Sequence, residues 1–147
     1  PEVVLAGRRI NDGMAKWVVD QLILEMCKKD IPIKMSKILI LGFTFKENCP
    51  DVRNTKVLEI IHILSSYKML VDIVDPCVDK FTVKEKYNLE ISDKLRKNKK
   101  YSVVILCVAH KQFLDISLSE WNELIDDNGI LFDLKGLIPR ELYPLRI

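Results

Sequence analysis

Charged and polar side chains that could contact a ligand are gathered in residues 43–54, directly after a short apolar run that Gly42 closes. They are Lys46, Asp51, Arg53 and Asn54. The stretch is also longer than the roughly 2 to 6 residues usual between a strand and a helix. Residue types alone leave two interpretations open, a ligand-binding loop or a surface loop with ordinary charges.

Two further polar groups follow apolar runs of the strand type. Ala109, His110 and Lys111 come after the run 101–108, and Leu134, Lys135 and Gly136 come after the run 129–133. In open parallel sheets, ligands bind at the carboxyl ends of the strands. We therefore expect any site to lie at that edge. For His110 we favour a turn histidine over a ligand contact, and we interpret His62 as a satisfied or exposed helical histidine.

The known phosphate-binding loops are absent from this sequence. A dinucleotide site needs glycines after the first strand, but Gly42 is followed by Phe43, Thr44, Phe45 and Lys46. The chain contains no Walker-type lysine motif either. The fold by itself is therefore compatible with many kinds of binding protein.

The four cysteines, Cys27, Cys49, Cys77 and Cys107, lie far apart and show no metal-ligand spacing. We predict no metal site and a reduced, cytoplasmic setting. Cys27 and Cys107 are interpreted as buried packing residues. Cys49 and Cys77 are interpreted as loop residues.

Composition is that of an ordinary globular protein. The chain has 147 residues, of which 48% are hydrophobic and 30% charged, enough for one domain with its own core. The formal net charge of +2 is spread along the sequence, so neither a nucleic acid nor an acidic membrane is an expected partner. Charges interrupt every apolar run before the roughly 20 residues that a membrane span needs. The basic cluster at 94–100 is interpreted as a solvated helix end.

The elements that position these residues follow from apolar periodicity. Residues 11–29 repeat apolar side chains at helical spacing on a broad face, and Pro32 ends the pattern. Continuous apolar runs at 37–42, 69–74, 101–108 and 129–133 predict buried strands. Helices are predicted at 55–67, capped by Asn54 or Thr55, and from Ser117 or Ser119 to residue 124. Residues 78–100 give mixed signals, with a short strand near 89–91.

The order of these elements predicts the fold class. Strands that alternate with helices indicate parallel units with right-handed crossovers. We therefore predict an α/β fold, a Rossmann-like open parallel sheet with helices on both faces, preceded by a long amino-terminal helix. The broad apolar face of that helix is more than one small domain usually covers, so part of it should meet another chain or domain.

Several blocks of sequence are more specific. Residues 37–61, KILILGFTFKENCPDVRNTKVLEII, and residues 71–76, VDIVDP, resemble the carboxy-terminal, UDP-binding domain of the UDP-glucose/GDP-mannose dehydrogenase family. The opening PEVVLAGRRINDGM resembles the helix that joins the two Rossmann-like domains of that family, and LCVAHKQF and LFDLKG resemble its later strand ends. The blocks VAHKQF and FKENCPDVRNTK most resemble the UDP-N-acetylhexosamine 6-dehydrogenases of surface polysaccharide biosynthesis, of the Vi or O-antigen type.

This resemblance implies an enzymatic role for a longer protein. The family oxidises the sugar alcohol twice with NAD, through a cysteine-linked thioester, to a uronic acid. Its nucleophilic cysteine lies in a glycine-rich motif upstream of the matching segment, so we assign no catalytic residue here. We expect this chain to be a carboxy-terminal fragment, inactive alone, because NAD would be bound mainly by the missing amino-terminal domain.

The resemblance also implies roles for residues of the stretch 43–54. Phe45 and Lys46 match a pair that contacts the UDP-sugar substrate. Arg53 matches an arginine that reaches the NAD cofactor. Asp51 is expected to hold the loop or Arg53 in place.

Two more substrate contacts are expected outside that stretch. Lys135 stands where some relatives carry a substrate-binding arginine, and it keeps the charge without the two-pronged guanidinium. Arg8 matches an arginine that binds the nucleotide sugar, often that of the neighbouring subunit. Arg9 is the alternative to Arg8.

Domain organisation and partners follow from the same resemblance. We expect residues 1–34 to end a central dimerisation region and residues 35–147 to form the Rossmann-like UDP-sugar-binding domain. The partners would be a UDP-sugar and a second copy of the chain, joined through the amino-terminal helix with Trp17 at the seam. The rival hypothesis is a stand-alone Rossmann-like or receiver-like regulatory module without enzymatic activity. It would use Asp72 or Asp75 as an acidic centre, and only Asp75 is suitably placed.

Overall fold

The computed structural model describes residues 2–147 and, within them, the side chains from Gly13 onward. Four strands form one parallel sheet in the order β2-β1-β3-β4. The strands are β1 (Lys37–Leu41), β2 (Leu70–Val74), β3 (Tyr101–Leu106) and β4 (Ile125–Asp133). The α-helices are α1 (Glu2–Lys28), α2 (Val57–Ser66), α3 (Lys80–Tyr87) and α4 (Leu118–Leu124). Two short 3-10 helices, η1 (Lys111–Asp115) and η2 (Arg140–Leu142), complete the elements.

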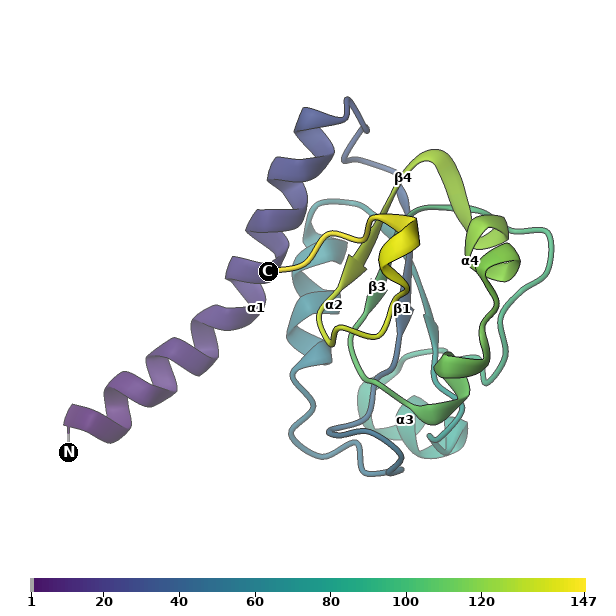
Figure 1. Cartoon of the computed structure of the whole chain (residues 1–147). Coiled ribbons are helices and arrows are strands. Elements are labelled where there is room, and N and C mark those ends of the chain that lie inside the picture. Colours follow the sequence, from purple (N-terminus) through teal and green to yellow (C-terminus); the bar gives the residue numbers. More distant parts are fainter. Residues whose placement is uncertain (1) are drawn as a thin grey trace.

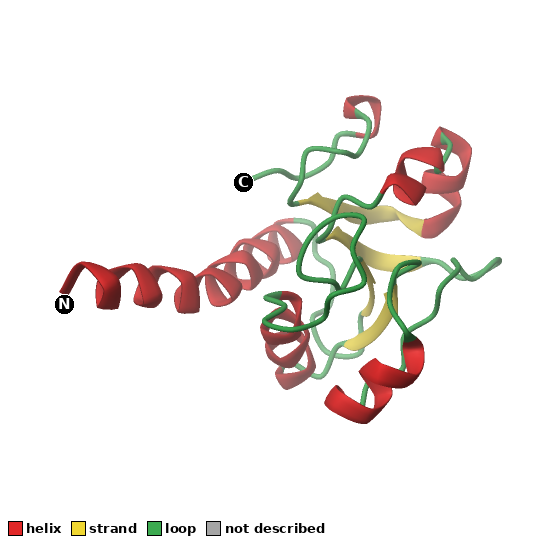
Figure 2. Cartoon of the chain, turned by 90° about the horizontal axis from the view of Figure 1, so that it is seen from below, coloured by secondary structure: helices red, strands yellow, loops and turns green. Residues whose placement is uncertain are grey.

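Alternating side chains of the strands build a core on each face of the sheet. Ile38 and Ile40 of β1 belong to the core that α1 and α2 cover, while Leu39 and Leu41 belong to the core under α4. The two layers of helices lie on opposite sides of the strands (Figures 1 and 2). This arrangement confirms the predicted Rossmann-like sheet with helices on both faces.

The strand order reverses between β1 and β3. The chain passes from β1 outward to β2 and then returns over β1 to β3, so the connections leave the carboxyl ends of these two strands in opposite directions. Such a switch point is where open α/β folds bind ligands. Gly42 permits the close packing there: its φ is +96°, and a Cβ would lie 2.6 Å from Cβ of Val108. The space beside this glycine is thus filled by Val108, two residues after the end of β3.

Several local predictions are confirmed. Ser117 caps α4 in a reciprocal capping box with Glu120. Cys107 is buried, and His62 is exposed. The expected strand near 89–91 is reduced to a single bridge between Val74 and Ser92.

Other local predictions are wrong, each for an identifiable reason. Cys27 is exposed because it lies one position past Met26, which takes the inward face of α1. The basic cluster at 94–100 belongs to an irregular segment and not to a helix end. At the start of α2, by contrast, Lys56 precedes Val57 without a side-chain cap, and the predicted Thr55 supplies one, because its hydroxyl accepts the N–H of Val57 at 3.2 Å. The helix α3 likewise agrees with the helical part of the mixed signals in residues 78–100.

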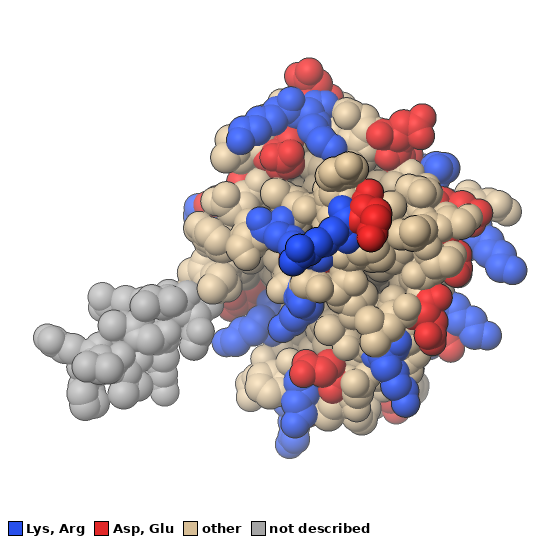
Figure 3. Space-filling view, viewed as in Figure 1, with Lys and Arg blue, Asp and Glu red and all other residues tan. Residues whose placement is uncertain are grey.

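Surface charge is mixed. On the face shown in Figure 3, basic and acidic side chains are interspersed over the domain. None of the helices in the described part of the chain is long and apolar enough to cross a membrane.

Candidate functional site

A buried carboxylate joins the carboxyl ends of three strands at the switch point. Asp75, which follows β2, is fully buried. Its Oδ2 accepts the backbone N–H groups of Phe43 at 2.6 Å and Thr44 at 3.1 Å, both after β1. Its Oδ1 accepts the N–H of Cys77 at 2.7 Å, and Nε2 of His110, after β3, lies 2.9 Å from Oδ2. The carboxylate therefore fixes where the loop after β1 begins.

This network also sets the ionisation of Asp75. Burial alone would raise the pKa of the carboxyl. The contact with His110 and the N–H groups of Phe43 and Cys77 outweigh that effect, so the pKa of Asp75 lies below its ordinary value. The carboxylate is therefore charged in the folded protein at neutral pH.

The hydrogen-bond partners of His110 assign its proton. Nδ1 accepts the backbone N–H of Asn48 at 2.9 Å, so it carries no hydrogen. Nε2–H faces Asp75 and also lies 3.1 Å from the Thr44 hydroxyl. The ring is completely buried and bridges the loop after β1 to the end of β3. His110 is thus a turn histidine, as favoured from sequence, but its buried linking role was missed.

The tip of the loop after β1 is held by further bonds. The Asn48 side chain accepts the N–H of Lys111 at 2.8 Å, while its own backbone has a positive φ of 56°. The Thr55 hydroxyl donates to the carbonyl of Phe43 at 2.5 Å, and Tyr87 donates to the carbonyl of Val52 at 2.6 Å. These hydrogen bonds fix the backbone of the loop, and with it the positions of the Cα atoms that carry its exposed side chains.

Those exposed side chains include the residues singled out in the sequence. Phe45 is 54% exposed although it is a large apolar residue, and Lys46 beside it is exposed as well. Arg53 is exposed and makes a two-pronged contact with Asp51, with distances of 3.0 and 3.1 Å. This contact lowers the pKa of Asp51 to about 2. Asp51 therefore positions Arg53, as the sequence suggested.

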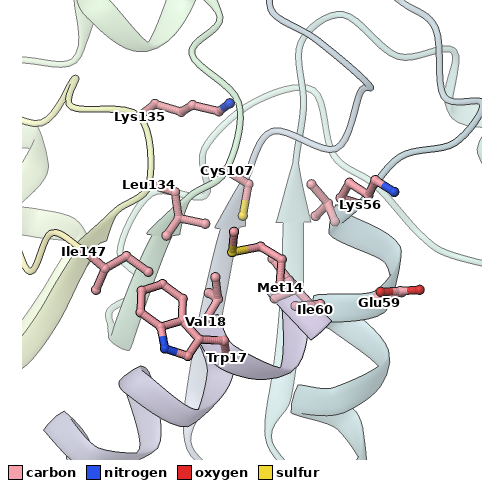
Figure 4. A pocket seen from close by; sticks show the side chains of 12 residues that line it. Met14, Trp17, Val18, Lys56, Glu59, Ile60, Cys107, Leu134, Lys135 and Ile147 are labelled. Atoms are coloured by element: carbon pink, nitrogen blue, oxygen red, sulfur yellow. The ribbon is translucent and has the colours of Figure 1, made fainter. Parts of the chain in front are cut away.

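A cleft of about 400 Å³ opens between α1, α2 and the ends of β3 and β4. Its apolar wall includes Trp17, Ile60 and Leu134, and Cys107 lies at its centre (Figure 4). Burial raises the pKa of the Cys107 thiol to about 12, so the sulfur there is neutral. An aromatic or apolar group of a ligand can be accommodated on such a surface.

Two lysines stand on the rim of this cleft. Lys135 follows β4 and Lys56 precedes α2, and both are drawn above the apolar wall in Figure 4. The Lys135 ammonium is turned toward the middle of that view, and the Lys56 ammonium is turned away from it. Lys135 was predicted as a site residue. Lys56 was missed, because a lysine one position before an apolar helix has the sequence pattern of an ordinary solvated residue.

The predicted site residues that the structure describes all lie at the carboxyl edge of the sheet, but they fall into two separate groups, one in the cleft and one on the loop after β1. Lys135 lines the cleft, whereas Phe45, Lys46 and Arg53 lie on the loop that leads to Lys56. The side chains of Arg8 and of its alternative Arg9 lie outside the described residues.

Asp75, Cys77 and His110 place a carboxylate oxygen, a sulfur and a ring nitrogen within 4.8 Å of one another. Cys77 Sγ lies 3.4 Å from Nδ1 of His110, the nitrogen already bound to Asn48. Burial and the charge of Asp75 raise the pKa of the Cys77 thiol, which disfavours the thiolate needed for a metal or a nucleophile. The cluster is therefore a satisfied structural network.

The same observation argues against the receiver-like alternative. A phosphoacceptor aspartate must present a free oxygen at the surface. Asp75 is fully buried, and both of its oxygens accept hydrogen bonds. Asp75 therefore cannot serve as the exposed acidic centre that the receiver-like hypothesis needs.

The described residues do not fit a nicotinamide dinucleotide by themselves. The connection after β1 has no glycine beyond Gly42, whose Cα is covered by Val108. Pyrophosphate would need an open backbone at that place. Arg53 is the one loop residue for which a cofactor contact was expected, and its guanidinium is exposed.

Comparison with known proteins supports the resemblance stated above. Residues 39–140 match the UDP-glucose/GDP-mannose dehydrogenase family, UDP binding domain. The whole chain is 42% identical to a UDP-N-acetyl-D-glucosamine 6-dehydrogenase of Salmonella typhi and 39% identical to one of Pseudomonas aeruginosa. It covers 34% and 35% of these proteins, so it spans about a third of their length.

Solved structures show the same fold. An NDP-N-acetyl-D-galactosaminuronic acid dehydrogenase from Methanosarcina mazei superposes on 93% of this chain with a TM-score of 0.77 at 19% identity, using 28% of its own length. A UDP-N-acetyl-mannosamine dehydrogenase from Staphylococcus aureus superposes on 94% with a TM-score of 0.70 at 22% identity, using 31% of its length.

The Asp75 network predicts a pH-dependent contribution to stability. Because the pKa of Asp75 is lowered on folding, its carboxylate stabilises the fold above the unfolded-state pKa, about pH 4, and this stabilisation is lost as the pH falls through the native pKa. We expect Asp75→Asn to lower the free energy of unfolding by about 2–4 kcal/mol at neutral pH. The difference in free energy of unfolding between the variant and wild type should become smaller below about pH 4, as measured by urea titration at several pH values.

A matched control is Asp93→Asn, which removes an exposed carboxylate paired with Lys80 at 3.1 Å. Solvent screens that pair, so the control should change stability little. Equal losses for the two variants, or a deficit of Asp75→Asn that does not depend on pH, would contradict the role given to Asp75.

Proposed function

Because this chain belongs to the UDP-glucose/GDP-mannose dehydrogenase family, matching its UDP-binding domain over residues 39–140, we propose that it binds the nucleotide-sugar substrate of a UDP-sugar 6-dehydrogenase. The proposed substrate is a UDP-N-acetylhexosamine, as the names of the relatives from Salmonella typhi and Pseudomonas aeruginosa suggest. The full enzyme would oxidise it twice with NAD to a UDP-uronic acid for polysaccharide biosynthesis in the cytoplasm.

The observation that carries this proposal is the composition of the cleft. UDP combines a flat base with a diphosphate of high negative charge. The apolar wall around Trp17 and Leu134 suits a base and a ribose, while Lys56 and Lys135 on the rim suit the diphosphate. The parallel strands β3 and β4 end at this cleft, where this class of fold binds ligands.

The loop after β1 supplies the remaining contacts in this proposal. Phe45 and Lys46 would meet the sugar and its phosphate, since both are exposed on a loop that Asp75 and His110 hold in place. Arg53, oriented by Asp51, would reach the cofactor. Arg8 remains a proposed substrate contact that rests on the resemblance.

The proposed work of this chain is binding and orientation. NAD would supply hydride acceptance when bound, but the described residues offer no dinucleotide loop, so we propose that another part of the full enzyme binds it. We assign no catalytic residue to this chain. Its lysines would hold the diphosphate and thereby position the sugar alcohol for oxidation elsewhere in the enzyme.

The first prediction concerns affinity for UDP. Isothermal titration calorimetry of the chain should show UDP binding, and Lys135→Met should weaken it about tenfold, because a charge-assisted contact to phosphate contributes about 1.5–3 kcal/mol. Lys46→Met should weaken the binding of the complete UDP-sugar more than that of UDP.

The control for these variants is Lys37→Met. Lys37 is exposed at the first position of β1, at the opposite edge of the sheet. Its loss should leave UDP affinity unchanged. Absence of heat with folded wild-type chain, or equal weakening by all three substitutions, would overturn the proposed site.

The second prediction concerns activity. The chain alone should form no NADH from UDP-N-acetylglucosamine or UDP-N-acetylgalactosamine, since the proposed catalytic and NAD-binding groups lie outside it. Absorbance at the NADH band reports this directly. NADH formation by pure chain would show that catalytic groups are present among these residues.

The third prediction concerns the homodimer proposed through α1, with residues 1–34 as the end of a central dimerisation region. One face of α1 packs in the core through Val19, Leu22 and Met26, yet Met14 and Trp17 remain about half exposed. Light scattering should show a dimer at micromolar concentration. Because Trp17 also lines the cleft, Leu24→Glu is the sharper variant: Leu24 is half-exposed one heptad after Trp17 and lies outside the cleft, and its replacement should shift the dimer toward monomer.

Lys16→Gln is the neighbouring control, because Lys16 is exposed and pairs only with Asp20 of the same helix at 2.8 Å among the described contacts. It should leave the dimer intact. A monomeric wild-type chain at that concentration would remove the dimer proposal.

A further inference from the structure

A second buried carboxylate shapes the turn that carries Lys135. Asp133, the last residue of β4, is buried. Its Oδ1 accepts the N–H groups of Lys135 at 3.1 Å and Gly136 at 2.8 Å, and its Oδ2 accepts the N–H of Ile138 at 2.9 Å. Three bonds to one side chain fix the backbone of residues 135–138. The backbone position from which the Lys135 side chain extends therefore depends on Asp133.

The partner of this carboxylate comes from the carboxy-terminal segment. Nε and Nη2 of Arg146 both lie 3.1 Å from Oδ2 of Asp133, and Nη2 also donates to the carbonyl of Ile138 at 2.6 Å. A buried carboxylate without a counterion is costly, and Arg146 supplies the counter-charge of Asp133. It also ties the far end of the turn to the same point.

The segment around Arg146 is itself fixed to the sheet. The N–H of Asp133 donates to the carbonyl of Leu145 at 2.8 Å, and the N–H of Leu145 donates to the carbonyl of Leu131 at 2.7 Å. These bonds form a parallel bridge at the free edge of β4, where Figure 1 shows the yellow segment beside the strand. Two residues later, Ile147 lines the same cleft as Lys135.

We propose that Arg146 is a positioning residue for Lys135 and so for the diphosphate of the ligand. This inference rests on the proposed function of the cleft. Arg146 acts through Asp133: its guanidinium holds the carboxylate, the carboxylate holds the turn, and the turn positions the lysine at the rim of the cleft. In this scheme Arg146 acts through its Nε and Nη2 donors, which are directed at Asp133 and Ile138.

The test compares UDP with uridine in calorimetry of the full chain. Arg146→Gln should weaken UDP binding about fivefold to tenfold, and it should leave uridine binding nearly unchanged, since uridine lacks the phosphates that Lys135 would hold. In a Lys135→Met background, Arg146→Gln should cause little further loss, because the two residues act through one contact.

Two further variants separate positioning from stability. Arg146→Lys keeps a positive charge near Asp133 and should restore part of the UDP affinity while it preserves the fold, as judged by circular dichroism. Arg140→Gln, an exposed arginine of η2, is the matched control and should bind UDP like wild type.

The outcomes distinguish this inference from the function on which it rests. If the wild-type chain binds no UDP, both are overturned. If Lys135→Met weakens binding but Arg146→Gln does not, the proposed function stands and the positioning role is overturned. Equal loss of UDP and uridine affinity, or fully additive losses in the double variant, would also overturn the positioning role, since they indicate a general structural effect.

Discussion

The geometry of the carboxyl edge of the sheet depends on the buried carboxylate of Asp75, whose charge must be stabilised by hydrogen-bond donors. Asp75 has no access to solvent, so its ionised form persists only because three backbone N–H groups and His110 surround it. These donors come from segments after β1, β2 and β3, whose ends the sheet already brings together, and the carboxylate fixes how the chain continues from them. The irregular loop after β1 can therefore have one conformation although it forms no regular element. Asp75 therefore anchors the start of the loop, while bonds made by Asn48, Thr55 and Tyr87 hold the rest of it.

Anionic and cationic side chains have opposite tasks at the carboxyl edge of the sheet. Asp75 and Asp133 are buried and turned toward backbone N–H groups, which they organise into loops. Lys46 and Lys135 are exposed on the loops so organised. Lys46 and Lys135 thus offer positive charge at this edge, although the molecule carries a formal net charge of only +2 and Glu59 also lines the cleft. An anion can be bound here without a strongly basic protein, because the two carboxylates that shape these loops, Asp75 and Asp133, face inward.

Sequence reasoning located the strands and the loop after β1 because these features are local. Continuous apolar runs mark strands buried on both faces, and their carboxyl ends place Lys46 and Lys135 at one edge of the sheet. It missed the burial of His110, since its partner Asp75 is 35 positions away and nothing in the intervening periodicity signals the contact. The pairing of Asp133 with Arg146 and the position of Lys56 on the cleft depend likewise on tertiary contacts. Cys27 was misplaced because a broad apolar helical pattern does not reveal which face the domain covers.

The central claim is that the carboxyl edge of this sheet holds a UDP-sugar. A crystal structure of the chain with UDP-N-acetylglucosamine tests it most directly. The account predicts the base against the apolar wall of the cleft, the diphosphate within hydrogen-bonding distance of the Lys135 ammonium, and the sugar directed toward the loop that carries Phe45 and Lys46. A ligand bound at the amino-terminal edge of the strands, or a cleft left empty at saturating ligand, would contradict it.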